Sequence, residues 1–257
     1  MKKILGVLTV IFVLGFSGAA DATPSTQIWI PSTDIQGFLV PHFGVDTYNT
    51  LGEKSIPNGG KGFNTINYGL TVGISPPGIS DKIGIEVGVD YRDVSGDSEN
   101  PWYWNAKLGL AEGAFGDISP AIAVGAYDMG NKDGVNDYNI VYGLVARTFG
   151  ELGRLSVGGF SGNDKLLLDG EGKKDNSGVL ASWDKAINDK WWVAADYMGG
   201  KSGYGALTLG FCYYILPSTS FIVGYDIYNN SDIKPTLTFQ LDINFDGLTH
   251  PHHAHKD

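Results

Sequence analysis

The chain lacks several features that would place it in familiar classes of protein. Cys212 is its only cysteine, so no internal disulfide can form. Its 18 Lys and Arg residues face 28 Asp and Glu residues, and the net charge of −10 disfavours nucleic acid as a partner. Beyond the first twenty residues, no apolar run approaches the roughly 20 residues that a membrane-spanning helix needs. A helical membrane protein and a nucleic-acid-binding protein are therefore poor descriptions of this sequence.

The one apolar run, at the start of the chain, predicts a secretion signal. Lys2 and Lys3 precede an apolar core at 4–16, and Ala20-Asp21-Ala22 has the form of an A-x-A cleavage site. This core is too short to span a bilayer, which disfavours an N-terminal anchor helix. We therefore expect residues 1–22 to be a signal peptide that is removed on export.

The rest of the chain is rich in alternation of period two. In the run 82–92, large apolar residues alternate with Gly84, Glu86, Gly88, Asp90 and Arg92. Similar segments recur along nearly the whole chain, at 37–48, 65–74, 82–92, 102–110, 120–127, 138–148, 153–160, 178–184, 191–197, 206–216, 221–228 and 235–245. Such repetition behind a secretion signal is typical of an all-β transmembrane antiparallel up-and-down β-barrel, here of about 12 strands.

A secreted β-sandwich is the alternative architecture, since its strands also alternate. Its outer face would be charged, whereas the polar face here is mostly Gly, Thr, Ser and Asn, and the apolar face carries aromatic residues at strand ends. The connections also alternate between longer polar loops, such as 161–177, and mostly tighter turns, such as 149–152. Bacterial barrels show this asymmetry, so we expect the tighter turns and both termini in the periplasm.

The segment 23–36, TPSTQIWIPSTDIQ, precedes the first predicted strand and does not alternate. It resembles the opening of a group of uncharacterised, porin-like outer-membrane β-barrel proteins of Gram-negative bacteria. The resemblance implies a barrel in the outer membrane and brings no catalytic residues with it. We expect a periplasmic N-terminal segment at 23–36 that caps the periplasmic mouth or enters the lumen, a barrel at 37–245, and a His-rich periplasmic tail at 246–257.

Candidate catalytic and metal-binding residues are few. His42 is the only histidine of the predicted barrel, and no G-x-S-x-G elbow occurs. We therefore expect His42 to be a lumen residue rather than a general base, and we expect no enzyme activity. The loop 128–137 fails the calcium-loop template, because Gly134 at position six puts Met129 at position one. The tail could bind Zn²⁺ or Ni²⁺ weakly, but disorder is the simpler reading. We expect no cofactor and no resident metal.

The charged residues of the polar faces are the candidate pore-lining set, because charges are costly on a lipid-facing surface. They are seven acids and four bases: Asp46, Glu86, Asp90, Asp184, Asp196, Asp226 and Asp242 with Arg92, Lys107, Arg147 and Arg154.

This acidic excess predicts a small passive channel for ions or small solutes with weak cation preference. Its expected partners are the lipid bilayer and those solutes, and its oligomeric state is open. The alternatives are a non-conducting structural or surface-binding barrel and, third, a barrel hydrolase.

Overall fold

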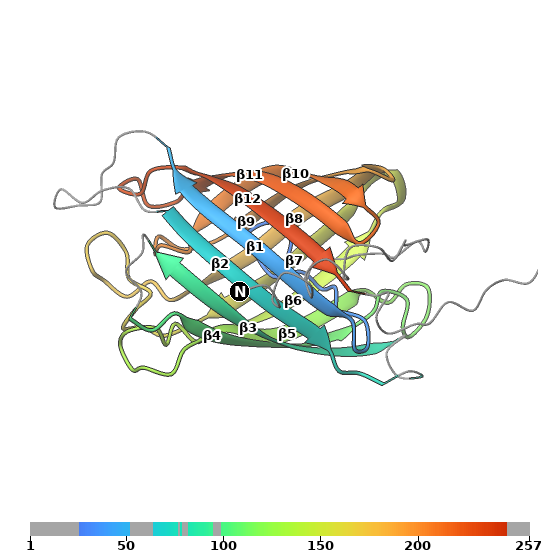
Figure 1. Cartoon of the computed structure of the whole chain (residues 1–257), viewed down its shortest axis with the longest axis horizontal. Coiled ribbons are helices and arrows are strands. Elements are labelled where there is room, and N and C mark those ends of the chain that lie inside the picture. Colours follow the sequence, from blue (N-terminus) through green and yellow to red (C-terminus); the bar gives the residue numbers. More distant parts are fainter. Residues whose placement is uncertain (1–25, 52–63, 77, 79–81, 95–98, 246–257) are drawn as a thin grey trace, which may run out of the picture.

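The described residues of the computed structural model, 26–51, 64–76, 78, 82–94 and 99–245, form a closed β-barrel of twelve strands (Figure 1). The strands are β1 (Pro41–Thr50), β2 (Asn64–Gly73), β3 (Ile83–Val94), β4 (Trp102–Leu110), β5 (Ala121–Met129), β6 (Ile140–Thr148), β7 (Arg154–Ser161), β8 (Ser177–Asn188), β9 (Trp191–Met198), β10 (Ala206–Leu216), β11 (Thr219–Tyr228) and β12 (Thr236–Asn244). The prediction of an antiparallel up-and-down barrel of about 12 strands is confirmed. The predicted signal peptide and the His-rich tail lie outside the described residues.

Each strand pairs with its neighbours in sequence, and β1 closes the barrel against β12. The closing register runs from His42 opposite Asn244 to Thr50 opposite Thr236. Closure leaves no strand edge unpaired, which removes the usual site of edge-to-edge aggregation. A single turn of 3-10 helix, Gly150–Leu152, is the one helical element of the described residues. The part of the chain that the structure describes therefore contains no helix that is long and apolar enough to cross a membrane.

The outward face of the barrel is apolar. Leu70, Val87, Leu108 and Leu209 are all between 38% and 48% exposed, although their side chains are wholly hydrocarbon. Aromatic pairs stand at strand ends on this face, such as Tyr91 with Trp102 and Trp191 with Tyr213, with ring centroids 5.2 and 4.8 Å apart. Soluble proteins rarely expose apolar surface of this extent, so the outward face is built for contact with an apolar medium.

The interior carries both polar residues and a packed core. Buried apolar residues from β6, β7, β8 and β9, including Leu144, Phe160 and Leu180, pack around Ile30. A second cluster joins Ile28 to Ala194, Cys212 and Ile222. Ile28 and Ile30 precede the first strand, so the segment that leads into β1 is itself part of the barrel core.

Most strands lie within two residues of the predicted ranges at each end, but β8 and β1 differ from theirs by four residues at one end. The last predicted residue of the eighth segment is Asp184, but β8 continues to Asn188 through a register shift between Ala186 and Asn188. β1 starts at Pro41 rather than at Gly37, because Leu39 has a positive φ of 54° and breaks the strand there. This break turns the chain from the interior into the wall.

Glu86 and Lys107 form an ion pair across β3 and β4. They are directly opposite each other, and Lys107 Nζ lies 3.1 Å from a carboxylate oxygen of Glu86. Both side chains are almost fully buried, at 3% and 4% exposed.

A double-mutant cycle of Glu86→Gln and Lys107→Met should show coupling of about 1 kcal/mol or more, because residues in contact within one buried network couple by roughly 0.5–3 kcal/mol. The measurement is the free energy of unfolding in detergent or lipid for the four proteins of the cycle. Additive effects of the two substitutions would contradict this register and facing.

Candidate functional site

The candidate site is the barrel interior, and it contains ten of the eleven residues of the predicted pore-lining set. Glu86, Lys107, Asp184, Asp196, Asp226 and Asp242 are buried inward, while Asp46, Asp90, Arg92 and Arg154 line interior cavities. The alternation of apolar and polar residues therefore predicted the correct face of the strand for most of these charged side chains.

Arg147 is the exception, and its predicted position in the lumen is wrong. On β6 the buried side chains are Ile140, Tyr142, Leu144 and Ala146, whereas Val145 is 42% exposed. Arg147 has the parity of Val145 and points outward, where it donates to the carbonyl oxygens of Asp117 and Ser119 at 2.8 and 3.1 Å. Both faces of β6 are largely apolar, because its inward side packs in the core, so alternation could not tell the two faces apart.

The segment Thr26–Gln36, called the plug below, lies inside the barrel. The backbone N–H groups of Ile28 and Trp29 both donate to one carboxylate oxygen of Asp196, at 2.8 and 2.9 Å. Gln240 Nε2 donates to the carbonyl oxygen of Ile28 at 2.8 Å. Asp196 is 1% and Gln240 3% exposed, so both satisfy plug backbone groups that have no strand partner. Of the two placements left open by the sequence, these contacts show entry into the lumen.

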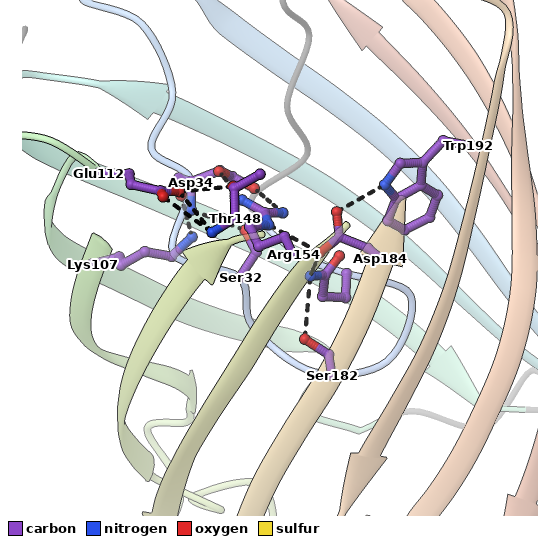
Figure 2. Close-up of polar contacts among 10 residues, drawn as sticks. Ser32, Asp34, Lys107, Glu112, Thr148, Arg154, Ser182, Asp184 and Trp192 are labelled. Carbon is purple, nitrogen blue, oxygen red and sulfur yellow. Dashed lines mark hydrogen bonds and ion pairs between the residues drawn. The ribbon is translucent and has the colours of Figure 1, made fainter. Parts of the chain in front are cut away.

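The second half of the plug is held by ion pairs (Figure 2). Arg154 lies between Asp34 and Asp184, with nitrogen–oxygen distances of 2.6 and 2.9 Å to Asp34 and 2.9 Å to Asp184. Lys107 Nζ donates to the carbonyl oxygen of Asp34 at 2.7 Å, and the N–H of Gln36 donates to Glu86 at 2.9 Å. Five of the eleven residues predicted to line a pore therefore anchor the plug, namely Glu86, Lys107, Arg154, Asp184 and Asp196.

Glycines of the wall make room for two of the three isoleucine side chains of the plug, Ile28 and Ile35. A Cβ on Gly84 or Gly109 would come within 2.6 or 2.8 Å of Ile35, and a Cβ on Gly210 or Gly224 within 2.8 or 2.9 Å of Ile28. Any larger residue at these positions would collide with the plug. Inward glycines were visible in the sequence as empty space, but the segment that fills this space could not be identified from them.

Two interior cavities flank the plug. The long-loop cavity, of about 340 Å³, opens toward the end of the barrel with the longer loops and is lined by Trp29, Tyr48, Asp90, Arg92 and Tyr204 among others. The short-turn cavity, of about 450 Å³, lies at the opposite end, beside Gly150 and Lys185. Thr26 of the plug lines both cavities, so the plug forms the partition between them.

A charged cluster closes one side of the long-loop cavity. Arg92 contacts Asp128 at 2.6 and 3.0 Å, and Tyr204 donates to the same carboxylate. Burial and the nearby Asp128 carboxylate raise the pKa of the Tyr204 hydroxyl well above its usual range, so the hydroxyl stays protonated and donates. The sequence placed Asp128 in a loop, but a bulge in the β4–β5 pairing carries it into the wall.

The described residues contain no group of three or more His, Cys, Asp or Glu side chains that could hold a metal ion. His42 Nε2 lies 3.2 Å from Asp242, and its Nδ1 lies 3.0 Å from the side-chain oxygen of Asn244. Ser220 donates to Asp242 at 3.4 Å. In this arrangement Asp242 lies between the imidazole and the hydroxyl, whereas a nucleophilic serine must contact the imidazole directly.

No protein-family model matches this chain, and no curated protein matches it. Solved structures similar to it include an outer membrane channel from Pseudomonas putida F1, at 12% identity, covering 88% of this chain and 100% of that one, with a TM-score of 0.48. The KdgM porin is 8% identical over 80% of this chain and 99% of its own, also with a TM-score of 0.48. A variant of the Rh. blastica porin is 7% identical, covering 80% and 98%, with a TM-score of 0.38. These similarities establish neither a family nor an activity for this chain.

Gly84→Ala should destabilise the protein by about 1–3 kcal/mol, the usual cost of overpacking, because its new methyl group would press on Ile35. Adding Ile35→Ala should recover part of this loss, since it removes the side chain that the methyl group meets. The measurement is the unfolding midpoint in detergent.

Gly143→Ala is the matched control, because a Cβ there meets nothing closer than 3.8 Å. A Gly84→Ala effect that is the same with and without Ile35 would contradict the placement of the plug.

Proposed function

We propose that this protein is an outer-membrane barrel that acts as a small passive channel for ions or small solutes, with weak cation preference. The observation that carries the proposal is the inverted barrel, apolar outside and charged inside, whose lumen retains two cavities beside the plug. Bacterial outer-membrane channels have this distribution of side chains. The plug supports a low conductance, because solutes must pass beside it.

The charges around the long-loop cavity support cation preference. Glu86 and Lys107 form one ion pair of its lining, and Arg92 and Asp128 form a second. Asp46, Asp90 and Asp242 also line this cavity, and no Lys or Arg of the described residues lies within ion-pair distance of them. Acids without a Lys or Arg partner inside low-dielectric walls concentrate a negative field and attract cations.

The second candidate is a non-conducting structural or surface-binding barrel. The fit between the plug and the wall favours it, because Ile28 and Ile30 are 2% and 0% exposed and burial of such a side chain contributes about 1.5–3 kcal/mol. A hydrolase has less support, since Asp242 separates Ser220 from His42.

The reversal potential in planar bilayers under a KCl gradient tests the proposal. We expect weak cation preference that fades at high salt, because charges are screened over about 10 Å at 0.1 M. The triple variant Asp46→Asn, Asp90→Asn and Asp242→Asn should lose this preference.

Asp226→Asn is the matched control, because Asp226 is fully buried against Thr208 and Thr236 and lines neither cavity. Anion preference of the unmodified protein would refute the proposed selectivity. Absence of any conductance would favour the non-conducting barrel.

A further inference from the structure

A loop on one side of the barrel contacts charged residues of the opposite side. Residues 199–205, called the strap below, join β9 to β10 at the end of the barrel with the longer loops. In the ring of twelve strands, β9 lies six places from β3 in either direction, so these two strands face each other across the lumen. The hydroxyl of Tyr204 nevertheless donates to Asp128 of β5 and accepts from Arg92 of β3, the latter at 3.3 Å. The strap and its tyrosine therefore cross the mouth of the barrel.

Tyr204 also connects the strap to the plug. The indole N–H of Trp29 donates to the carbonyl oxygen of Tyr204 at 2.8 Å. The ring of Tyr204 lies against that of Tyr138, with centroids 5.3 Å apart, and packs on the core cluster that contains Ile30. Gly203 and Tyr204 both line the long-loop cavity. One residue of the strap thus contacts the plug, the wall and the core, and its position shapes the cavity.

The base of the strap is fixed by neighbouring loops. Asn229 Nδ2 donates to the carbonyl oxygen of Gly200 at 2.7 Å, and the N–H of Asn229 donates to the carbonyl oxygen of Gly205 at 2.9 Å. The carboxylate of Asp175 accepts from the N–H of Lys201. These contacts hold the two ends of the strap and leave its tip to be held from the other side of the lumen.

The tip of the strap depends on one large side chain. Four of the seven residues of the strap are glycines, and besides Tyr204 its side chains are only those of Lys201, which is exposed, and Ser202. Loops with few apolar contacts open locally at low cost in free energy. Glycines such as Gly200, whose φ is 84°, absorb the backbone rotations of a hinge. The contacts of Tyr204 therefore hold the tip in place.

We propose that the strap is a gate over the mouth at the long-loop end and that the contact of Tyr204 with Arg92 and Asp128 is its latch. With the latch closed, a solute can enter the long-loop cavity only beside the strap. When the latch opens, the mouth widens, so Tyr204 sets the size of solute that enters. Because Trp29 donates to Tyr204, movement of the strap also releases one contact of the plug. This inference rests on the proposed function, since a gate requires a channel.

Tyr204→Phe tests the latch, because it removes the hydroxyl and keeps the ring and the carbonyl oxygen that Trp29 contacts. In single-channel recordings, the variant should raise the ratio of open to closed time about 10-fold or more, since it removes hydrogen bonds to charged groups from the closed state alone. It should also admit larger neutral sugars in a liposome-swelling assay than the unmodified protein does. Asp128→Asn should act in the same direction and add less in the Tyr204→Phe background, because both changes weaken one latch.

Tyr138→Phe is the matched control. Tyr138 lines the same cavity and touches the Tyr204 ring, yet its hydroxyl makes none of the hydrogen bonds of the latch. Its open-to-closed ratio and its size limit for sugars should equal those of the unmodified protein.

The outcomes separate the gate from the channel. A Tyr204→Phe protein that conducts with the open-to-closed ratio and size limit of the unmodified protein would overturn the gate and leave the channel intact. Equal increases in Tyr204→Phe and Tyr138→Phe would also overturn the gate, because the latch would then not be their cause. Current from Tyr204→Phe but not from the unmodified protein would support both proposals. Absence of current from every variant would overturn the channel itself, and the gate with it.

Discussion

The requirement that every buried backbone group find a hydrogen-bond partner governs this structure. In the wall, closure of β1 against β12 meets the requirement by strand pairing. In the lumen, the plug has no strand to pair with, so side chains of the wall supply the hydrogen-bond partners of its backbone. Asp196 accepts the N–H groups of Ile28 and Trp29, and Gln240 donates to the carbonyl oxygen of Ile28. The interior charges that contact the plug therefore follow from the presence of an irregular segment inside a closed barrel.

The same requirement divides the interior charges into two groups. Asp196, Asp184, Arg154, Glu86 and Lys107 are engaged with the plug. Asp46, Asp90 and Asp242, on β1, β3 and β12, border the cavity that the plug leaves open. The anchoring group fixes the partition of the lumen, and in the channel that we propose the second group sets the electrostatic field of the cavity. A structural role for the first group and a functional role for the second are thus compatible within one barrel.

Alternation of side chains was sufficient to predict the barrel, because an apolar medium outside and a polar lumen impose period two on every strand. The tenth segment, predicted at 206–216, has the same limits as β10 (Ala206–Leu216). Prediction was wrong where the lumen is not polar. Arg147 follows a strand whose inward side packs in the core, so the pattern carried no information about which face is which.

The plug illustrates what one sequence cannot show. Its residues do not alternate, and its partners lie between 50 and 212 positions away along the chain. Inward glycines at 84, 109, 210 and 224 marked space in the wall, yet only the fold shows that Ile35 and Ile28 occupy it. Likewise, the bulge that brings Asp128 to Arg92 depends on the pairing of β4 with β5.

The central claim is that residues 26–36 partition the lumen of a channel. The most direct measurement is the single-channel conductance of the mature barrel with and without these residues, compared in the same bilayer and salt. Removal should join the two cavities and raise the conductance several-fold, provided that the variant retains the heat stability of a closed barrel. An unchanged conductance in a correctly closed barrel would contradict the claim.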